Sequence, residues 1–224
     1  MRVKPSFDTG GETRFVFSQE ILGEYVSTIP SLIMHGHIRK LTGDRTAVAS
    51  ALLLGRAVTE RLEVGRPISQ RVAAQIRSFT GVEGLDIPET TSVPVAVHTG
   101  SVELVVARGP GELPTLQQSD RRLMVLREVP SHQAAGRFFS FESITLATNS
   151  WIFGEASLMR NGITELEAAL AVPVLMAQDL SASKVTIPSN LARAVSEQRL
   201  RAIARLLNTT DLQLNVEGAP VHVR

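Results

Sequence analysis

Two histidines separated by a single glycine, His35 and His37, are the first residues in the chain whose type and spacing could do chemistry. If residues 31–41 form a strand, both imidazoles point to one face and could hold a metal ion or a phosphate. A metal ion would need a third ligand from far along the chain, such as His98 or an acidic residue. Two surface histidines beside a flexible glycine are the plain alternative. One hypothesis is therefore a soluble enzyme with an anion or metal site at this pair and Arg39 as an anion clamp.

Basic side chains, mostly arginine, concentrate in one block that an acidic block follows. Residues 31–80 hold eight Lys or Arg and three Asp or Glu, whereas residues 81–120 hold one Arg and six acids. The planar fork of arginine suits phosphate, so the basic block could bind nucleic acid. The two blocks could also pair between copies of the chain, or be ordinary solvated charge. The candidate nucleic-acid-binding residues of the block are Arg39, Lys40, Arg45, Arg56, Arg61, Arg66, Arg71 and Arg77.

Two runs place phenylalanines two positions apart behind an arginine: Arg14-Phe15-Val16-Phe17 and Arg137-Phe138-Phe139-Ser140-Phe141. In a strand, such phenylalanines share one face. RNA-binding sheets display aromatic side chains in this way, and bases stack on them. The alternative is that these side chains belong to the core, because the chain has only eight Phe. The candidates for RNA contact in the second run are Arg137, Phe139 and Phe141.

Several kinds of chemistry are not indicated by the sequence. The chain has no Cys, so it has neither disulfides nor thiolate metal ligands. It contains no P-loop, no dinucleotide fingerprint, no Gly-x-Ser-x-Gly and no His-Glu-x-x-His. No run approaches the roughly 18 apolar residues of a membrane span, and the first residues lack the apolar run of a signal peptide. We therefore expect a cytoplasmic protein with no cofactor, no bound metal and no membrane contact.

The basic block must be positioned by helices. The longest stretch with a helical period is 44–64, where apolar residues recur at three- and four-residue steps and charged residues take the other side. A second helix is expected after Pro67, which suits a first helical turn, and Gly81 is a natural left-handed stop. The two helices would form an αα-hairpin. Residues 1–12 are expected to be an irregular arm.

The rest of the chain is rich in strand signals. Thr164 and Glu167 have capping-box spacing, and the helix that they open is expected to stop before Pro173. One long helix is expected over 191–207, followed by a β-hairpin of 212–216 and 221–223. The strands expected before it are 14–18, 93–98, 102–107, 123–129, 137–146 and 185–187, with the second and third of these forming a hairpin.

These elements predict an α+β fold: an antiparallel sheet with an N-terminal αα-hairpin and a long C-terminal helix followed by a β-hairpin. Residues 1–224 are expected to be a single domain. An internal boundary near 82–92 would separate a mainly helical part, 13–81, from a β-rich part, 93–224.

The leading functional hypothesis is a non-enzymatic binding subunit of a prokaryotic, for instance bacterial, assembly that contacts nucleic acid through the basic helical face. It depends on the charge blocks, on the arginine-led aromatic strands and on the lack of a catalytic signature. The enzyme centred on His35 and His37 is one alternative, and a homo-oligomeric scaffold is the other.

Overall fold

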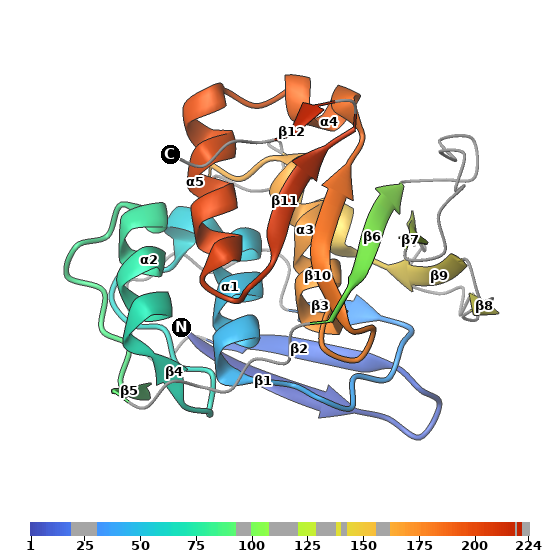
Figure 1. Ribbon diagram of the computed structural model, residues 1–224. Helices are drawn as coiled ribbons and strands as arrows, with labels where there is room; N and C mark the ends of the chain where they lie inside the picture. Colours follow the sequence, from blue (N-terminus) through green and yellow to red (C-terminus); the bar gives the residue numbers. More distant parts are fainter. Residues whose placement is uncertain are drawn as a thin grey trace.

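The computed structural model is shown in Figure 1. It describes residues 1–18, 31–92, 100–107, 121–128, 138–139, 143–155, 162–217 and 219–220.

Within this part of the chain, one sheet holds ten strands in the order β1-β2-β3-β9-β7-β6-β10-β11-β12, with β8 paired to β9 as well. The strands β9, β7, β6, β10 and β11 run parallel to one another, and the remaining pairs are antiparallel. In Figure 1, β1 and β2 cross the lower part of the view and the parallel strands stand above them. The bounds are β1 Arg2–Phe7, β2 Thr13–Ser18, β3 Ser31–Met34, β6 Val102–Ala107, β7 Arg121–Glu128, β8 Phe138–Phe139, β9 Ser143–Thr148, β10 Ala182–Ile187, β11 Gln213–Val216 and β12 Ala219–Pro220. Two further short strands, β4 (Ile68–Ser69) and β5 (Thr90–Thr91), pair separately.

The helices stack outward from the sheet. Helix α3 contacts β6 and the 3-10 helix η3, α1 packs on α3, and α2 packs on both α1 and α5. Figure 1 shows α1 between α2 and α3, which explains why every residue of α1 is buried. The bounds are α1 Gly43–Leu54, η1 Gly55–Ala57, α2 Gln70–Thr80, η3 Ser150–Gly154, α3 Glu165–Met176, α4 Ser189–Arg193 and α5 Glu197–Asn208.

The predicted αα-hairpin is wrong. Helix α1 ends at Leu54, and the chain then runs through η1 and an extended segment before α2 begins. In that segment Leu62 and Val64 are buried while Glu63 between them is partly exposed, which is the period of a strand. The Leu62 amide donates to the carbonyl of Asp86 at 2.9 Å. The apolar residues past 54 therefore extended the helical pattern by coincidence.

The predicted antiparallel sheet is also wrong, because its centre is parallel. The connection from β9 to β10 contains α3, and the connection from β10 to β11 contains α4 and α5, so each returns the chain in the same direction. Four consecutive residues of β6, Leu104 to Ala107, are buried, which is typical of a parallel strand covered on both faces. Residues 1–12 are not an irregular arm, since they contain β1. Pro5 is tolerated there because β1 lies at the edge of the sheet.

The C-terminal elements differ from the prediction in two ways. Pro173 lies inside α3, a helix whose residues are nearly all buried, so packing offsets the lost hydrogen bond. The long helix expected over 191–207 is split into α4 and α5, because Ser196 caps the start of α5 by accepting from the Arg199 amide. The last helix leads into β11, which pairs parallel with β10 and, over two residue pairs, antiparallel with β12. The expected strand 221–223 lies outside the described residues.

Among the described residues, no helix combines the length and the apolar character that crossing a membrane requires. The division of the chain near residues 82–92 stays a prediction.

Candidate anion-binding pocket

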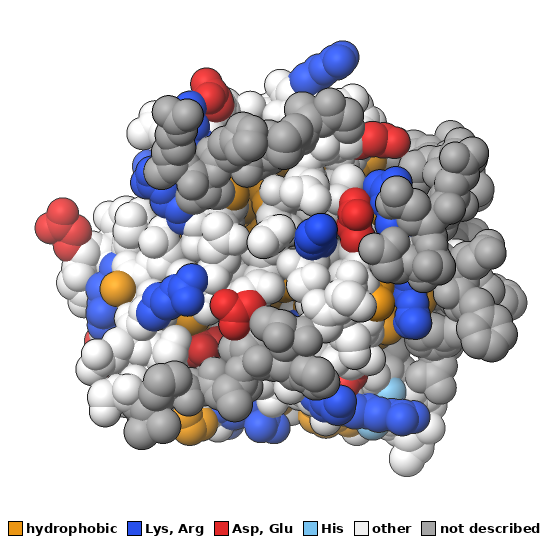
Figure 2. Space-filling model, in the orientation of Figure 1, with side chains coloured by type: hydrophobic (Ala, Val, Ile, Leu, Met, Phe, Trp, Pro, Cys, Tyr) orange, Lys and Arg blue, Asp and Glu red, His pale blue; other side chains and the backbone are white. Residues whose placement is uncertain are grey.

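A pocket of about 450 Å³ opens where three segments meet: the end of β1, the connection from β3 to α1, and the loop before β4. This volume lies within the range of roughly 300–1,000 Å³ that is usual for ligand pockets. In Figure 2, Lys or Arg side chains and histidine lie side by side at the lower edge of this face. The residues that line the pocket are Phe7, His37, Ile38, Arg39, Lys40, Leu41 and Arg66.

Backbone contacts fix the two walls of this pocket. The Asp179 carboxylate, on the turn before β10, accepts from the amide of Arg39 at 2.6 Å and from that of Lys40 at 2.9 Å. On the other side, a Cβ at Gly43 would stand 2.0 Å from the carbonyl oxygen of Pro67. Only glycine permits this approach, which brings the loop carrying Arg66 against the start of α1.

The cations of the pocket have no partner in the described part of the chain. The side chains of Arg39, Lys40 and Arg66 are exposed, and none forms a hydrogen bond or ion pair with a described residue. Among the residues that the structure describes, no acidic side chain lines the pocket. Helix α1 begins directly beyond it at Gly43, so the positive end of the helix dipole adds to the same potential. The pocket can therefore bind an anion.

Phe7 adds an aromatic ring to this basic surface. It is 42 % exposed and is the large apolar side chain that the described part of the chain leaves most open to solvent. Its ring centroid lies 5.6 Å from that of His37, with the two rings tilted by 57°. The sequence prediction missed Phe7, because it placed residues 1–12 in an irregular arm. The turn signal at Asp8 to Gly11 directly after it could have indicated a hairpin.

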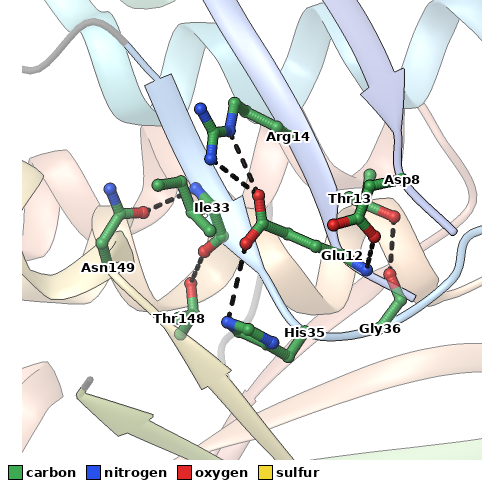
Figure 3. A network of polar contacts seen from close by, with 9 residues as sticks. All are labelled: Asp8, Glu12, Thr13, Arg14, Ile33, His35, Gly36, Thr148 and Asn149. Carbon is green, nitrogen blue, oxygen red and sulfur yellow. Dashed lines mark hydrogen bonds and ion pairs between the residues drawn. The ribbon is translucent and has the colours of Figure 1, made fainter. Parts of the chain in front are cut away.

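The two histidines take different partners. Strand β3 ends at Met34, so the alternation expected over 31–41 does not extend to His37. The Nε2 atom of His35 lies 3.8 Å from Oε2 of Glu12, whose other oxygen accepts from Arg14 at 2.8 Å (Figure 3). Within the described residues, no group of three or more His, Cys, Asp or Glu could hold a metal ion. His98 lies outside them.

Arg45 is not on the surface. Its side chain is 1 % exposed, and none of its three guanidinium nitrogens has a hydrogen-bond partner in the described part of the chain. Burial lowers the pKa of Arg45 to about 10, an effect that the negative charges of Asp211 and Asp179 partly oppose. A ligand at the surface does not reach this guanidinium.

The other arginines of the basic block lie away from the pocket. Arg61 pairs with Asp86 at 3.6 Å and with Glu63 at 3.8 Å. The remaining predicted positions divide into three kinds. Arg71 donates to the carbonyl of Asn208 at 2.6 Å and Arg77 to that of Leu85 at 2.8 Å. Arg56 is exposed on η1. The structure does not describe the side chains of Arg137, Phe139 and Phe141.

The first aromatic run belongs to the core. Phe15 is 2 % exposed and Phe17 is 8 % exposed, and Phe17 meets Phe153 edge to face with centroids 5.7 Å apart. These two rings therefore offer no face to a base.

Comparisons with protein-family models, with curated proteins and with solved structures find no match to this chain.

Proposed function

We propose that the protein is a non-enzymatic nucleic-acid-binding protein that contacts the phosphate backbone at this pocket. The observation that carries the proposal is the convergence of His37, Arg39, Lys40 and Arg66 on one hollow, with the three longer side chains exposed and unpaired among the described residues.

Nucleic acid fits this arrangement better than a small free anion does. Proteins that bind single strands combine a positively charged groove with an aromatic side chain, and the pocket has Phe7 beside its cations. The formal net charge of the chain is only +1, so attraction to a polyanion must come from a local surface. This pocket replaces the basic helical face that the sequence predicted as the binding surface. On that face Arg45 is buried, and Arg61, Arg71 and Arg77 have partners in the chain.

The proposal favours binding over catalysis. Within the described residues, the lining contains no serine, threonine, tyrosine or carboxylate that His37 could activate or be oriented by. The wider role, as a cytoplasmic subunit of a prokaryotic assembly, is part of the same proposal and depends on the sequence alone.

The test is the affinity for a short labelled single-stranded RNA, measured by fluorescence anisotropy at about 50 mM and about 200 mM salt. The wild-type protein should bind more weakly at the higher concentration. The double variant Arg39→Ala/Arg66→Ala should lose about tenfold or more in affinity, because two phosphate contacts are removed. The matched control is Arg56→Ala/Arg193→Ala, which removes the same charge from two exposed arginines that do not line the pocket.

Equal affinity of both double variants would contradict the proposed site. Binding by the wild-type protein that does not depend on salt, or no binding at the lower salt concentration, would contradict nucleic-acid binding itself.

A further inference from the structure

The pocket has an aromatic wall that phosphate binding does not need. Phe7 is the last residue of β1, and its backbone is held by pairing with Thr13 across the hairpin. Its ring is nevertheless 42 % exposed, although core positions of the same sheet bury Phe15 and Phe17 almost completely. One exposed ring alone would be ordinary, but a ring that shares a hollow with Arg and Lys side chains is the combination that single-strand-binding surfaces use.

The ring is oriented so that one more planar group can lie against it. The rings of Phe7 and His37 meet at a tilt of 57° with their centroids 5.6 Å apart, so His37 can lie against at most one of the two faces of the Phe7 ring. Arg39, Lys40 and Arg66 line the same pocket, so a planar group on Phe7 lies within the same small volume as the cations that would hold its phosphate.

We infer that the pocket takes one unpaired nucleotide of a single strand, with its base stacked on Phe7 and its phosphate held by Arg39, Lys40 and Arg66. The inference rests on the proposed function and narrows it. In a duplex the bases are stacked on one another and their faces are closed, so a protein that uses a ring in this way selects single strands. Phe7 is then the residue that determines this specificity.

The experiment compares three ligands of equal total phosphate number: a single-stranded oligonucleotide, a duplex of half its length, and the same single strand with abasic sites. The wild-type protein should bind the first about tenfold more tightly than either of the others, because stacking of one base contributes about 1–3 kcal/mol. Phe7→Leu should reduce that preference to near unity and leave the affinity for the abasic strand unchanged. Phe7→Trp should keep the preference.

The possible results distinguish failure of the stacking inference from failure of the proposed function. If Phe7→Leu binds the single strand as the wild-type protein does, or if the wild-type protein binds all three ligands equally, the stacking inference is wrong and phosphate binding remains. If the wild-type protein binds none of them, both are wrong. Thermal unfolding of Phe7→Leu within a few degrees of the wild-type midpoint shows that a loss of preference is not a loss of fold.

Discussion

Arginines beside α2 and α5 are held by contacts within the protein, whereas those of the pocket have no partner among the residues that the structure describes. Arg199 is the firmest of the held group: its Nε donates to Glu167 at 2.6 Å, its Nη1 donates to the carbonyl of Phe79, and its guanidinium lies 4.0 Å from the Phe79 ring centroid. Arg39 and Arg66 have no such contacts with the described residues. A cation count along the sequence thus says little about binding, because availability depends on what each guanidinium already contacts.

The acidic residues near the pocket differ from those around α2 and α5 in what they contact. Asp179 accepts from two backbone amides of the wall, and Oδ1 of Asp44 accepts from the amide of Ser69 at 2.7 Å. These carboxylates fix the backbone, and among the described residues neither forms an ion pair with Arg39, Lys40 or Arg66. Around α2 and α5, in contrast, carboxylates and carbonyls accept directly from guanidinium groups.

The largest effect is expected where a held arginine loses its partner. Glu167 is fully buried, accepts from the backbone amide of Thr164 in the capping box, and binds Arg199. Glu167→Ala should lower the free energy of unfolding by about 3 kcal/mol or more, as is usual when a buried pair is broken. Urea denaturation measures this. The matched control is Glu197→Ala, which removes an exposed pair with Arg201 and should cost about 0.5 kcal/mol or less. Equal losses would show that Arg199 is not held as described.

Arg45 tests the opposite case, a buried cation with no hydrogen-bond partner in the described part of the chain. Arg45→Met keeps an unbranched, flexible side chain, shortens it and removes the charge. It should raise the free energy of unfolding by about 1 kcal/mol, because the cost of burying an unpaired guanidinium is lost. Denaturant midpoints at constant slope measure the change. A loss of stability of that size would instead reveal a partner for Arg45 and remove the contrast drawn here.

The smallest effect is expected at Asp44 and depends on pH. Burial raises the pKa of Asp44, and the hydrogen bonds from Ser69 only partly oppose it. The folded protein therefore keeps this proton to a higher pH than the unfolded chain, so the contribution of Asp44 to stability is greatest below the unfolded pKa of 3.8 and falls as the pH rises toward the folded value. Asp44→Asn keeps the acceptor oxygen without the charge.

The unfolding free energy of Asp44→Asn, relative to wild type, should accordingly increase from pH ~3 upward and become constant above the folded pKa. Urea titrations at four or five pH values would show it. A difference that is constant over this range would mean that Asp44 titrates alike in both states.

Local signals in the sequence predicted local structure well. Gly81 adopts the left-handed conformation at the end of α2, and Thr164 and Glu167 form the capping box at the start of α3. Both depend on neighbours within four residues. The direction of the strands and the end of α1 could not be found in this way, because they depend on distant contacts. Leu62 donates to Asp86, and β1 pairs with β2 on one side and with Glu63 on the other.

The sequence indicated which residues could bind an anion, but not that they lie together in one pocket. Arg39, Lys40, Arg66 and His37 were all candidates from the sequence. Their meeting depends on the contact of Gly43 with Pro67 and on the hydrogen bonds from Asp179, whose partners are 139 and 140 residues away in the chain. No periodicity or motif reports a contact at that separation.

The carboxylate of Asp179 has a consequence for how any ligand is received. One side chain on the turn before β10 holds two consecutive amides of the pocket wall, so the backbone from which Arg39 and Lys40 extend is fixed when the protein folds. Association then needs little further ordering of the backbone there, and the entropic cost falls on the long side chains and on the incoming molecule. A flexible chain of phosphates can adjust to that fixed backbone, but a stiff one must already match it.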